Sequence, residues 1–420
     1  MLKNRQVWAW ALYDFANSPF ATSVMAVIFN VYFATVVARD APIRGLTLWT
    51  FLISGSTLLS GILSPYLGAL ADIRKTRKRW LAGCAGAGAV STAALFFSGP
   101  QTLVLTSAFF VIASVCFTVS LTFYHSFLND LSTDRTIGSV SGFGWAIGYV
   151  GGGLCLALNL AMIQKPVWFG LPEGDSAVRA TFLVVGLWWL VFTLPFIFWI
   201  KEQRDAAGPP RAGREALRRV MDSIRAARKY NKNIFVFLAA YFLYNDVIET
   251  VIVVAGIFAA AELGMPESER IACFLMIQFV AFFGAVAFGR LADRWTQRKA
   301  LLASLALWAG ILLWTTTMTT RAEFWIAGFL ISIVLGGSQA VSRSLFGRLV
   351  PAGQEAQFFG FWGLSGKISA ATGPLIFGIV HEWTGQIRRA ILSLLVLLIA
   401  GMALLAFVKE SREYDRNAAC

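Results

Sequence analysis

Long apolar runs recur along the whole 420-residue chain and constrain its fold more than any other feature. A helix needs about 20 apolar residues to cross the ~30 Å hydrocarbon core of a bilayer. The runs that reach this length lie at about 8–38, 46–71, 80–99, 101–128, 138–164, 179–200, 233–261, 270–292, 300–319, 323–349, 357–382 and 387–408. Because every backbone amide in lipid needs an internal hydrogen bond, they predict an all-α integral membrane protein with 12 transmembrane helices.

The composition excludes the common alternatives. Hydrophobic residues make up 57% of the chain and charged residues 14%, and the mean hydropathy is +0.66. A soluble domain has about 25% charged residues, so a soluble protein, a disordered chain and a nucleic-acid-binding tail are all excluded, despite a net charge of +13. The first apolar run is too long for a cleaved signal peptide.

Recognisable catalytic and metal-binding motifs are missing from the sequence. The five cysteines are scattered without a Cys-x-x-Cys pair, so we expect reduced packing residues and neither a metal site nor a disulfide framework. The sequence contains no phosphate loop, no His-Glu-x-x-His pair and no Gly-x-Ser-x-Gly turn. We therefore expect no cofactor, no ATP coupling and no enzyme activity.

The distribution of Lys and Arg predicts the orientation of the chain. Twelve spans place both termini on one side of the membrane. If that side is the cytoplasm, it receives about 26 of the 36 Lys and Arg residues, and the other side receives about eight. We expect a multi-pass protein of the cell inner (plasma) membrane with both termini in the cytoplasm.

The longest polar connection divides the chain into domains. We expect an N-terminal six-helix bundle over 1–200, a cytoplasmic linker over 201–232 and a C-terminal six-helix bundle over 233–420. The linker pattern over 215–230 is amphipathic and predicts a surface helix that lies on anionic lipid headgroups. A calmodulin-type target or a nucleic-acid site is the alternative. The expected partners are the lipid bilayer, a small-molecule substrate and protons, with no nucleic acid, and the expected state is a monomer.

A loop motif occurs twice. Gly68–Asp72 followed by Arg77-Lys78 recurs 221 residues later as Gly289–Asp293 followed by Arg298-Lys299, each time between the second and third helix of its half. Glycine permits close helix approach, and aspartate can cap a neighbouring helix or pair with the loop arginines. We interpret the motif as a latch between the cytoplasmic ends of the two halves; the alternative is a merely positive cytoplasmic loop. The expected gating residues are Gly68, Asp72, Arg77, Gly289, Asp293 and Arg298.

These loops resemble the G-x-L-A-D-x-x-G-R-K signature of the major facilitator superfamily, although Lys75 and Thr296 replace its second glycine. The resemblance implies two six-helix bundles with pseudo-two-fold symmetry around a central cavity, and alternating access by rocking. The first helix, Trp10–Ser18, together with Gly366-Lys367 and Gly373-Pro374, resembles the unknown-major-facilitator subfamily. That group is kin to the fungal vacuolar effluxer linked to autophagy, which implies an amino-acid-like cargo.

Polar residues inside the predicted spans are the candidates for function, because a charge in lipid costs ~2.5–3.5 kcal/mol. The proton-coupling candidates are Glu249, Asp246, Asp14 and His125. The substrate-binding candidates are Tyr13, Asn17, Tyr241, Asn245, Arg343 and Lys367. The alternative is static pairing, of Asp246 or Glu249 with Lys367 and of Asp14 with Arg343.

The sequence as a whole favours a secondary active transporter for a small polar solute, zwitterionic or anionic and amino-acid-like, coupled to protons. The alternatives are an exporter of amphipathic drugs or siderophores, and a membrane sensor that binds a ligand without moving it. A channel and an intramembrane enzyme fit less well, because neither a filter-forming repeat nor a nucleophile with a base stands out.

Overall fold

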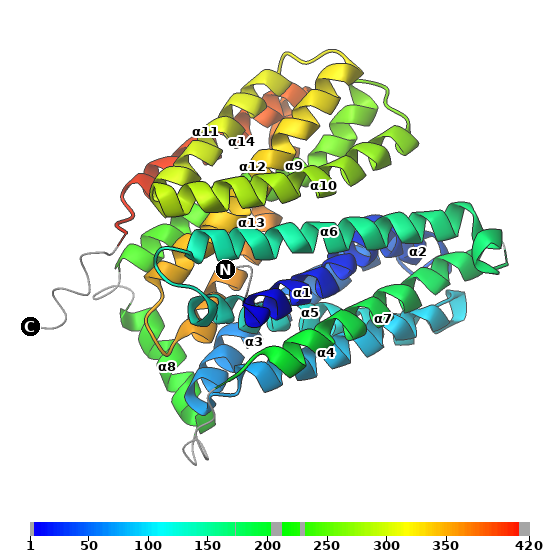
Figure 1. Cartoon of the computed structure of the whole chain (residues 1–420). Helices are drawn as coiled ribbons and strands as arrows, with labels where there is room; N and C mark the ends of the chain where they lie inside the picture. Colours follow the sequence, from blue (N-terminus) through cyan, green and yellow to red (C-terminus); the bar gives the residue numbers. More distant parts are fainter. Residues whose placement is uncertain (1–3, 173, 203–211, 227–231, 411–420) are drawn as a thin grey trace, which may run out of the picture. The chain divides into compact units, whose positions relative to one another are not determined.

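The computed structural model describes residues 4–172, 174–202, 212–226 and 232–410, and every regular element in these ranges is a helix (Figure 1). Eleven helices in the described ranges are long and apolar enough to cross a membrane, and the bent first segment brings the number to twelve. The expectation of an all-α protein with 12 transmembrane helices is therefore confirmed.

The helices of the first half begin with a broken span. It comprises α1 (Arg5–Pro19), a π-helical stretch (Phe20–Val27), α2 (Phe29–Tyr32) and a second π-helical stretch (Phe33–Val37). The other helices of this half are α3 (Gly45–Arg74), α4 (Arg77–Ala94), α5 (Leu103–Leu131), α6 (Ile137–Gln164) and α7 (Asp175–Trp199). Short 3-10 turns cover Leu95–Phe97, Pro100–Thr102 and Pro166–Phe169.

The remaining helices lie in the linker and in the second half of the chain. The linker contains α8 (Ala212–Ala226), which confirms a helix within the predicted amphipathic segment, while 227–231 lie outside the described residues. The helices of the second half are α9 (Lys232–Ala261), α10 (Glu267–Arg294), α11 (Gln297–Thr315), α12 (Arg321–Leu349), α13 (Glu355–Thr384) and α14 (Ile387–Ala406).

The first span is bent, whereas the sequence predicted one continuous run. Its two parts, Arg5–Val27 and Phe29–Val37, meet at 42°, so the bend lies at Ile28 and not at Pro19. Pro19 has no backbone N–H, so the carbonyl of Phe15 is free to accept a hydrogen bond from the indole of Trp188 at 3.0 Å. Beyond Pro19 the bonding pattern widens, and the N–H of Ile28 donates to the carbonyl of Ser23.

The chain folds into two compact units. Unit 1 combines Met1–Phe127 with Ile147–Leu217, and unit 2 combines Leu128–Ala146 with Arg218–Cys420. These units differ from the predicted halves because Leu128–Ala146, from the end of α5 through the first ten residues of α6, packs with unit 2, and because the boundary between the units falls within the predicted linker. The contacts that hold this segment involve α10 and α12, and they are described below.

Close helix contacts within each unit depend on glycine. In unit 2, a Cβ on Gly284 of α10 would lie 2.1 Å from the carbonyl oxygen of Ile333 on α12, and a Cβ on Gly336 would lie 2.2 Å from that of Ala281. In unit 1, a Cβ on Gly186 of α7 would lie 2.6 Å from the carbonyl oxygen of Ala89 on α4. These backbones are near enough that any side chain at the glycine would force the helices apart.

Candidate functional site

Asp246 joins α9 to a weak point of α13. Its carboxylate accepts a hydrogen bond from the backbone N–H of Gly373 at 2.6 Å, directly before Pro374 in the middle of α13. A Cβ on Gly373 would lie 2.1 Å from Oγ1 of Thr250, so α9 and α13 touch at this level. Asp246 therefore holds the backbone of α13 where proline disrupts the regular helix. Its predicted proton-coupling role stays a prediction.

Glu249 on α9 and Lys367 on α13 carry opposite charges and interact electrostatically across the same helix pair. Glu249 lies on α9 about one turn beyond Asp246, and Lys367 lies on α13 about two turns before Gly373. Both charges are within apolar spans, where they are expensive unless they compensate one another. Glu249 and Lys367 are thus two predicted candidates of opposite charge, and both belong to unit 2.

The other predicted residues of α9 lie beside this charged pair. Asn245 donates to the hydroxyl of Ser369 on α13 at 3.3 Å. The ring of Tyr241 packs against Trp362 of α13 with centroids 5.2 Å apart. The predicted face of α9 that carries Tyr241, Asn245 and Glu249 is thus the face that contacts α13.

The matching residues of the first span have different surroundings. Tyr13 is fully buried and packs against the rings of Tyr124 and Phe196, each with centroids 5.5 Å away. Asn17 donates to the backbone carbonyl of Tyr13 at 2.9 Å, within its own helix. The sequence repeat relates Tyr13 to Tyr241, but Tyr13 lies in an aromatic cluster of unit 1.

Asp14 and His125 lie at the edge of the same aromatic cluster. The hydroxyl of Tyr124 donates to the carboxylate of Asp14 at 3.1 Å, and the ring of His125 lies 5.2 Å from the ring of Tyr124. A Cβ on Gly148 of α6 would lie 2.8 Å from the carboxyl carbon of Asp14. Asp14 is therefore wedged between α5 and α6, and its proton-coupling role stays a prediction.

Arg343 connects α12 to the beginning of α6. Its side chain is fully buried, and its guanidinium donates to the hydroxyl of Ser141 at 3.0 Å and to the carbonyl of Ser141 at 2.7 Å. The guanidinium also lies over the ring of Trp145, 5.3 Å from its centroid. These contacts help to hold Leu128–Ala146 in unit 2.

Asp293 caps α6. Its two carboxylate oxygens accept the N–H groups of Gly138 and Ser139 at 2.8 Å each, at the positive end of the helix. A Cβ on Gly289 would lie 2.5 Å from the carbonyl oxygen of Gly138, so glycine is required for this approach. The helix cap expected for this aspartate is present, and its gating role stays a prediction.

In the first copy of the loop, the aspartate pairs with a loop arginine, which is the other interaction expected for it. Arg77 lies 4.0 Å from the carboxylate of Asp72, donates to the carbonyl of Ser126 at 3.3 Å and stacks over Phe127. Lys75 has a φ of 49°, in the left-handed region that favours glycine. Lys75 replaces the signature glycine, yet its backbone keeps the left-handed conformation that glycine adopts easily. In the second copy of the loop, Thr296 takes the same place with an extended backbone.

Glu202 and Glu410, which were not among the predicted site residues, accept backbone N–H groups of these two loops. In unit 1, the carboxylate of Glu202 accepts the N–H of Lys78 at 3.1 Å, and Lys78 Nζ donates to the carbonyl of Ile200 at 2.7 Å. The N–H of Lys201 donates to Oε1 of Gln6 at 3.2 Å. Burial raises the pKa of Glu202, against the opposing effect of the Lys78 N–H and the Arg77 charge.

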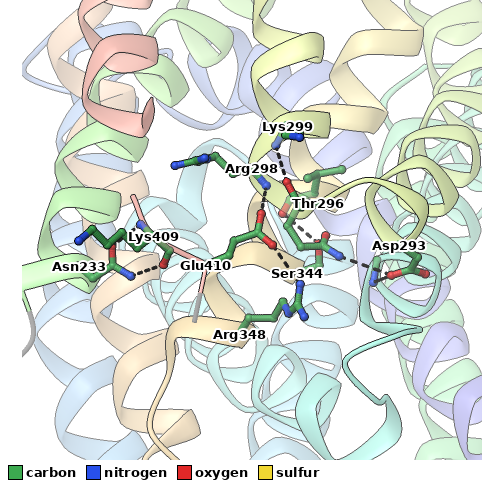
Figure 2. Close-up of polar contacts among 12 residues, drawn as sticks. Asn233, Asp293, Thr296, Arg298, Lys299, Ser344, Arg348, Lys409 and Glu410 are labelled. Atoms are coloured by element: carbon green, nitrogen blue, oxygen red, sulfur yellow. Dashed lines mark hydrogen bonds and ion pairs between the residues drawn. The ribbon is translucent and has the colours of Figure 1, made fainter. Parts of the chain in front are cut away.

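The same arrangement occurs in unit 2 around Glu410 (Figure 2). Glu410 accepts the N–H of Arg298 and pairs with Arg348 at 3.1 Å. The N–H of Lys409 donates to Oδ1 of Asn233 at 2.8 Å. The signal in the sequence was the dipeptide Lys-Glu at the end of the sixth span and again at the end of the twelfth, 208 residues later.

Comparisons with known proteins agree with this architecture. The family described as "Vacuole effluxer Atg22 like" matches residues 46–418. A Bacillus subtilis protein described as the uncharacterized MFS-type transporter YxiO is 29% identical over 98% of this chain and 96% of its own length. Autophagy-related protein 22 of Eremothecium gossypii is 24% identical over 95% of this chain and 90% of its own length.

Solved structures share the fold. The human organic anion transporter MFSD10 (TETRAN) has a TM-score of 0.73 at 16% identity and covers 96% of this chain and 99% of its own. The proton:xylose symporter XylE, solved with 6-bromo-6-deoxy-D-glucose, has a TM-score of 0.73 at 13% identity and covers 97% of this chain and 96% of its own. The chain therefore belongs to the Atg22-like family of the major facilitator superfamily and is a multi-pass membrane transporter, not an enzyme.

Proposed function

We propose that the protein carries a small polar solute with a carboxylate, zwitterionic and amino-acid-like, by proton-coupled alternating access. The observation that carries this proposal is the pair formed by Glu249 and Lys367 within the apolar spans α9 and α13. A zwitterion offers one charge to each partner: its carboxylate replaces Glu249 at the ammonium of Lys367, and its ammonium replaces Lys367 at Glu249. Either exchange leaves the two protein charges compensated, which a low-dielectric site requires.

Glu249 is also the group that we assign to proton coupling. When the solute leaves, Glu249 can take up a proton and become neutral. The empty site then carries one charge fewer within the membrane while the protein changes its access, which lowers the cost of that change. Tyr241 and Asn245 lie on the same face of α9 and supply polar atoms beside the pair. Asp246 is less suited to this role, because its carboxylate already holds the Gly373 N–H.

Orientation and gating complete the proposal. We place the protein in the inner membrane as a monomer, and we assign both termini to the cytoplasm because of the Lys and Arg distribution. The duplicated loops act as a gate in which Asp72 and Asp293 release their contacts when access changes. Asp72→Asn is expected to shift cysteine accessibility toward the cytoplasm-open state, and unchanged accessibility would remove the gate role.

The experiment uses the full-length protein in proteoliposomes. A thermal-shift screen with amino acids, peptides, siderophores and amphipathic drugs identifies a ligand, and uptake of that ligand is then measured under an imposed pH gradient. We expect a zwitterion to bind and a pH gradient to drive its accumulation in the wild type. Glu249→Gln should still exchange solute across the membrane but lose the proton-driven accumulation, and Lys367→Gln should lose binding.

Glu262→Gln is the matched control, because Glu262 pairs with Arg388 at 3.4 Å in the loop region and should transport as the wild type does. Wild-type proton dependence in Glu249→Gln would exclude this residue as the coupling group. Binding without flux would identify a sensor, and a response to amphipathic drugs or siderophores alone would favour the exporter alternative.

A further inference from the structure

Two cysteines meet between α4 and α5 in unit 1. The helices run in opposite directions: Arg77 at the beginning of α4 donates to the carbonyl of Ser126 near the end of α5. Two turns farther along α4, the thiol of Cys84 interacts with the thiol of Cys116 through a side-chain hydrogen bond. Both cysteines are free and partly exposed.

The backbones of α4 and α5 are close together next to the two thiols. Gly88 lies one turn beyond Cys84 on α4, and a Cβ at Gly88 would lie 3.2 Å from the Cβ of Cys116. A disulfide brings the Cβ atoms of its own two cysteines to about 3.5–4.5 Å, so closely packed helix backbones beside the thiols favour it. The glycine thus brings α4 close to α5 next to the two thiols, and neither helix has a bulky side chain at Gly88 to separate them.

We propose that Cys84 and Cys116 form a dithiol modification site that organic hydroperoxides close to a disulfide. In the first step, one thiol reduces the hydroperoxide to an alcohol and becomes a sulfenic acid. In the second step, the sulfur of the other thiol displaces the sulfenic oxygen, which leaves as water with the remaining proton. The two thiols are oxidised, the peroxide bond is reduced, and no charge remains in the membrane.

The chemistry of the site favours this modification over metal binding. Two thiolates around a monovalent soft cation would leave a net negative charge within an apolar helix pair, whereas the disulfide is neutral. The other described cysteines lack a thiol neighbour: the sulfur of Cys155 accepts from Asn159, and Cys273 lies against Gly328. Because α4 and α5 both belong to unit 1, the bond would stiffen that unit alone.

The test is oxidation of the full-length purified protein in lipid nanodiscs with cumene hydroperoxide. Free thiols are then alkylated, and chymotrypsin, which cuts between the cysteines at Phe96 and Phe97, separates the two peptides for mass spectrometry. We expect a disulfide-linked pair of peptides with Cys84 and Cys116, a melting temperature that rises by several degrees, and reversal of both by dithiothreitol.

Variants check the assignment. Cys155→Ser should form the link as the wild type does, while Cys84→Ser and Cys116→Ser should lose it and leave a sulfenic acid that dimedone traps. Continued alkylation of Cys84 and Cys116 under conditions that oxidise free cysteine would overturn the proposal, as would a link to any other cysteine. If a variant does not fold, peptide mapping of the wild-type protein decides the question alone.

Discussion

Glu249 and Lys367 stabilise the protein only as a pair, and this makes their substitutions non-additive. The two opposite charges interact within apolar spans, so removing one of them leaves the other less compensated, whereas neutralising both removes the imbalance. We therefore expect Glu249→Gln and Lys367→Met each to lower the melting temperature, and the double variant to recover most of the loss. Melting curves of detergent-solubilised protein measure this, and equal additive losses in the double variant would show that the residues do not interact.

Asp246 makes a different prediction, because it acts on a backbone group. Asparagine keeps an acceptor oxygen for the N–H of Gly373, so Asp246→Asn should cost about 1 kcal/mol or less of the free energy of unfolding. Asp246→Leu leaves that N–H unsatisfied next to Pro374 and should cost about 1–3 kcal/mol. The difference between the two variants, measured by thermal unfolding, separates the backbone role from a role of the negative charge. Similar losses in both would indicate that the charge itself is required.

Glu202 predicts a pH effect on stability. Burial raises its pKa in the folded state, so the folded protein holds this proton more tightly than the unfolded chain does. The stabilisation is complete below the ordinary glutamate pKa and is lost as the pH rises through the raised value. Glu202→Gln should show a flatter dependence of the melting temperature on pH above the ordinary glutamate pKa of about 4. An unchanged slope in Glu202→Gln would contradict the assignment.

The polar residues in the spans could be identified from the sequence, but their partners could not. A run of apolar residues makes Asp246 or Arg343 conspicuous, yet Asp246 bonds to Gly373, 127 residues away, and Arg343 bonds to Ser141, 202 residues away. Repeat equivalence is also a poor guide to surroundings, since Tyr13 and Tyr241 occupy matching positions but different environments. Such partners depend on how helices pack, and no local pattern records that packing.

At the scale of helices, the sequence was a good guide to length and a weaker guide to shape. The apolar runs predicted every long helix to within a few residues, because bilayer thickness fixes the number of residues that must be apolar. The bend of the first span was not predicted, because it lies at Ile28, nine residues beyond Pro19, where neither proline nor glycine marks it. Pro19 is tolerated within the span because the indole of Trp188 donates to the carbonyl of Phe15 that the proline leaves without a donor.

The contact between α10 and α12 gives a prediction with an internal control. Gly284→Ala places a methyl group 2.1 Å from the carbonyl oxygen of Ile333 and should cost about 1–3 kcal/mol or separate the helices. Gly310→Ala on α11 meets nothing within 4 Å and should instead stabilise its helix by about 0.5–1 kcal/mol. Thermal unfolding of the two variants should therefore move in opposite directions. A Gly284→Ala variant as stable as the wild type would show that this close contact is not needed.

At the scale of the whole molecule, duplication explains more than the loop motif alone. In each unit, a Lys-Glu dipeptide follows the last helix of the repeat, and its glutamate accepts an N–H from the beginning of the third helix. The preceding lysine N–H donates to an amide side chain at the beginning of the first helix, Gln6 in one unit and Asn233 in the other. Each unit thus ties three helix ends together on the side that carries the basic loops, so those ends can move as one body.

The distribution of charge makes the final prediction, which concerns topology. Lys and Arg resist translocation, and the side that carries the duplicated motif, the linker and both termini holds about 26 of the 36, so these segments should be cytoplasmic. An epitope fused to the C-terminus of the full-length chain should be detected only after the membrane is permeabilised. An epitope inserted after Gly170, in the short exposed turn that follows α6, should be detected on intact spheroplasts. A single orientation of the chain must account for both tags. Detection of the C-terminal tag on intact spheroplasts would therefore place the Asp72 and Asp293 loops outside the cytoplasm and exclude them as a cytoplasmic gate.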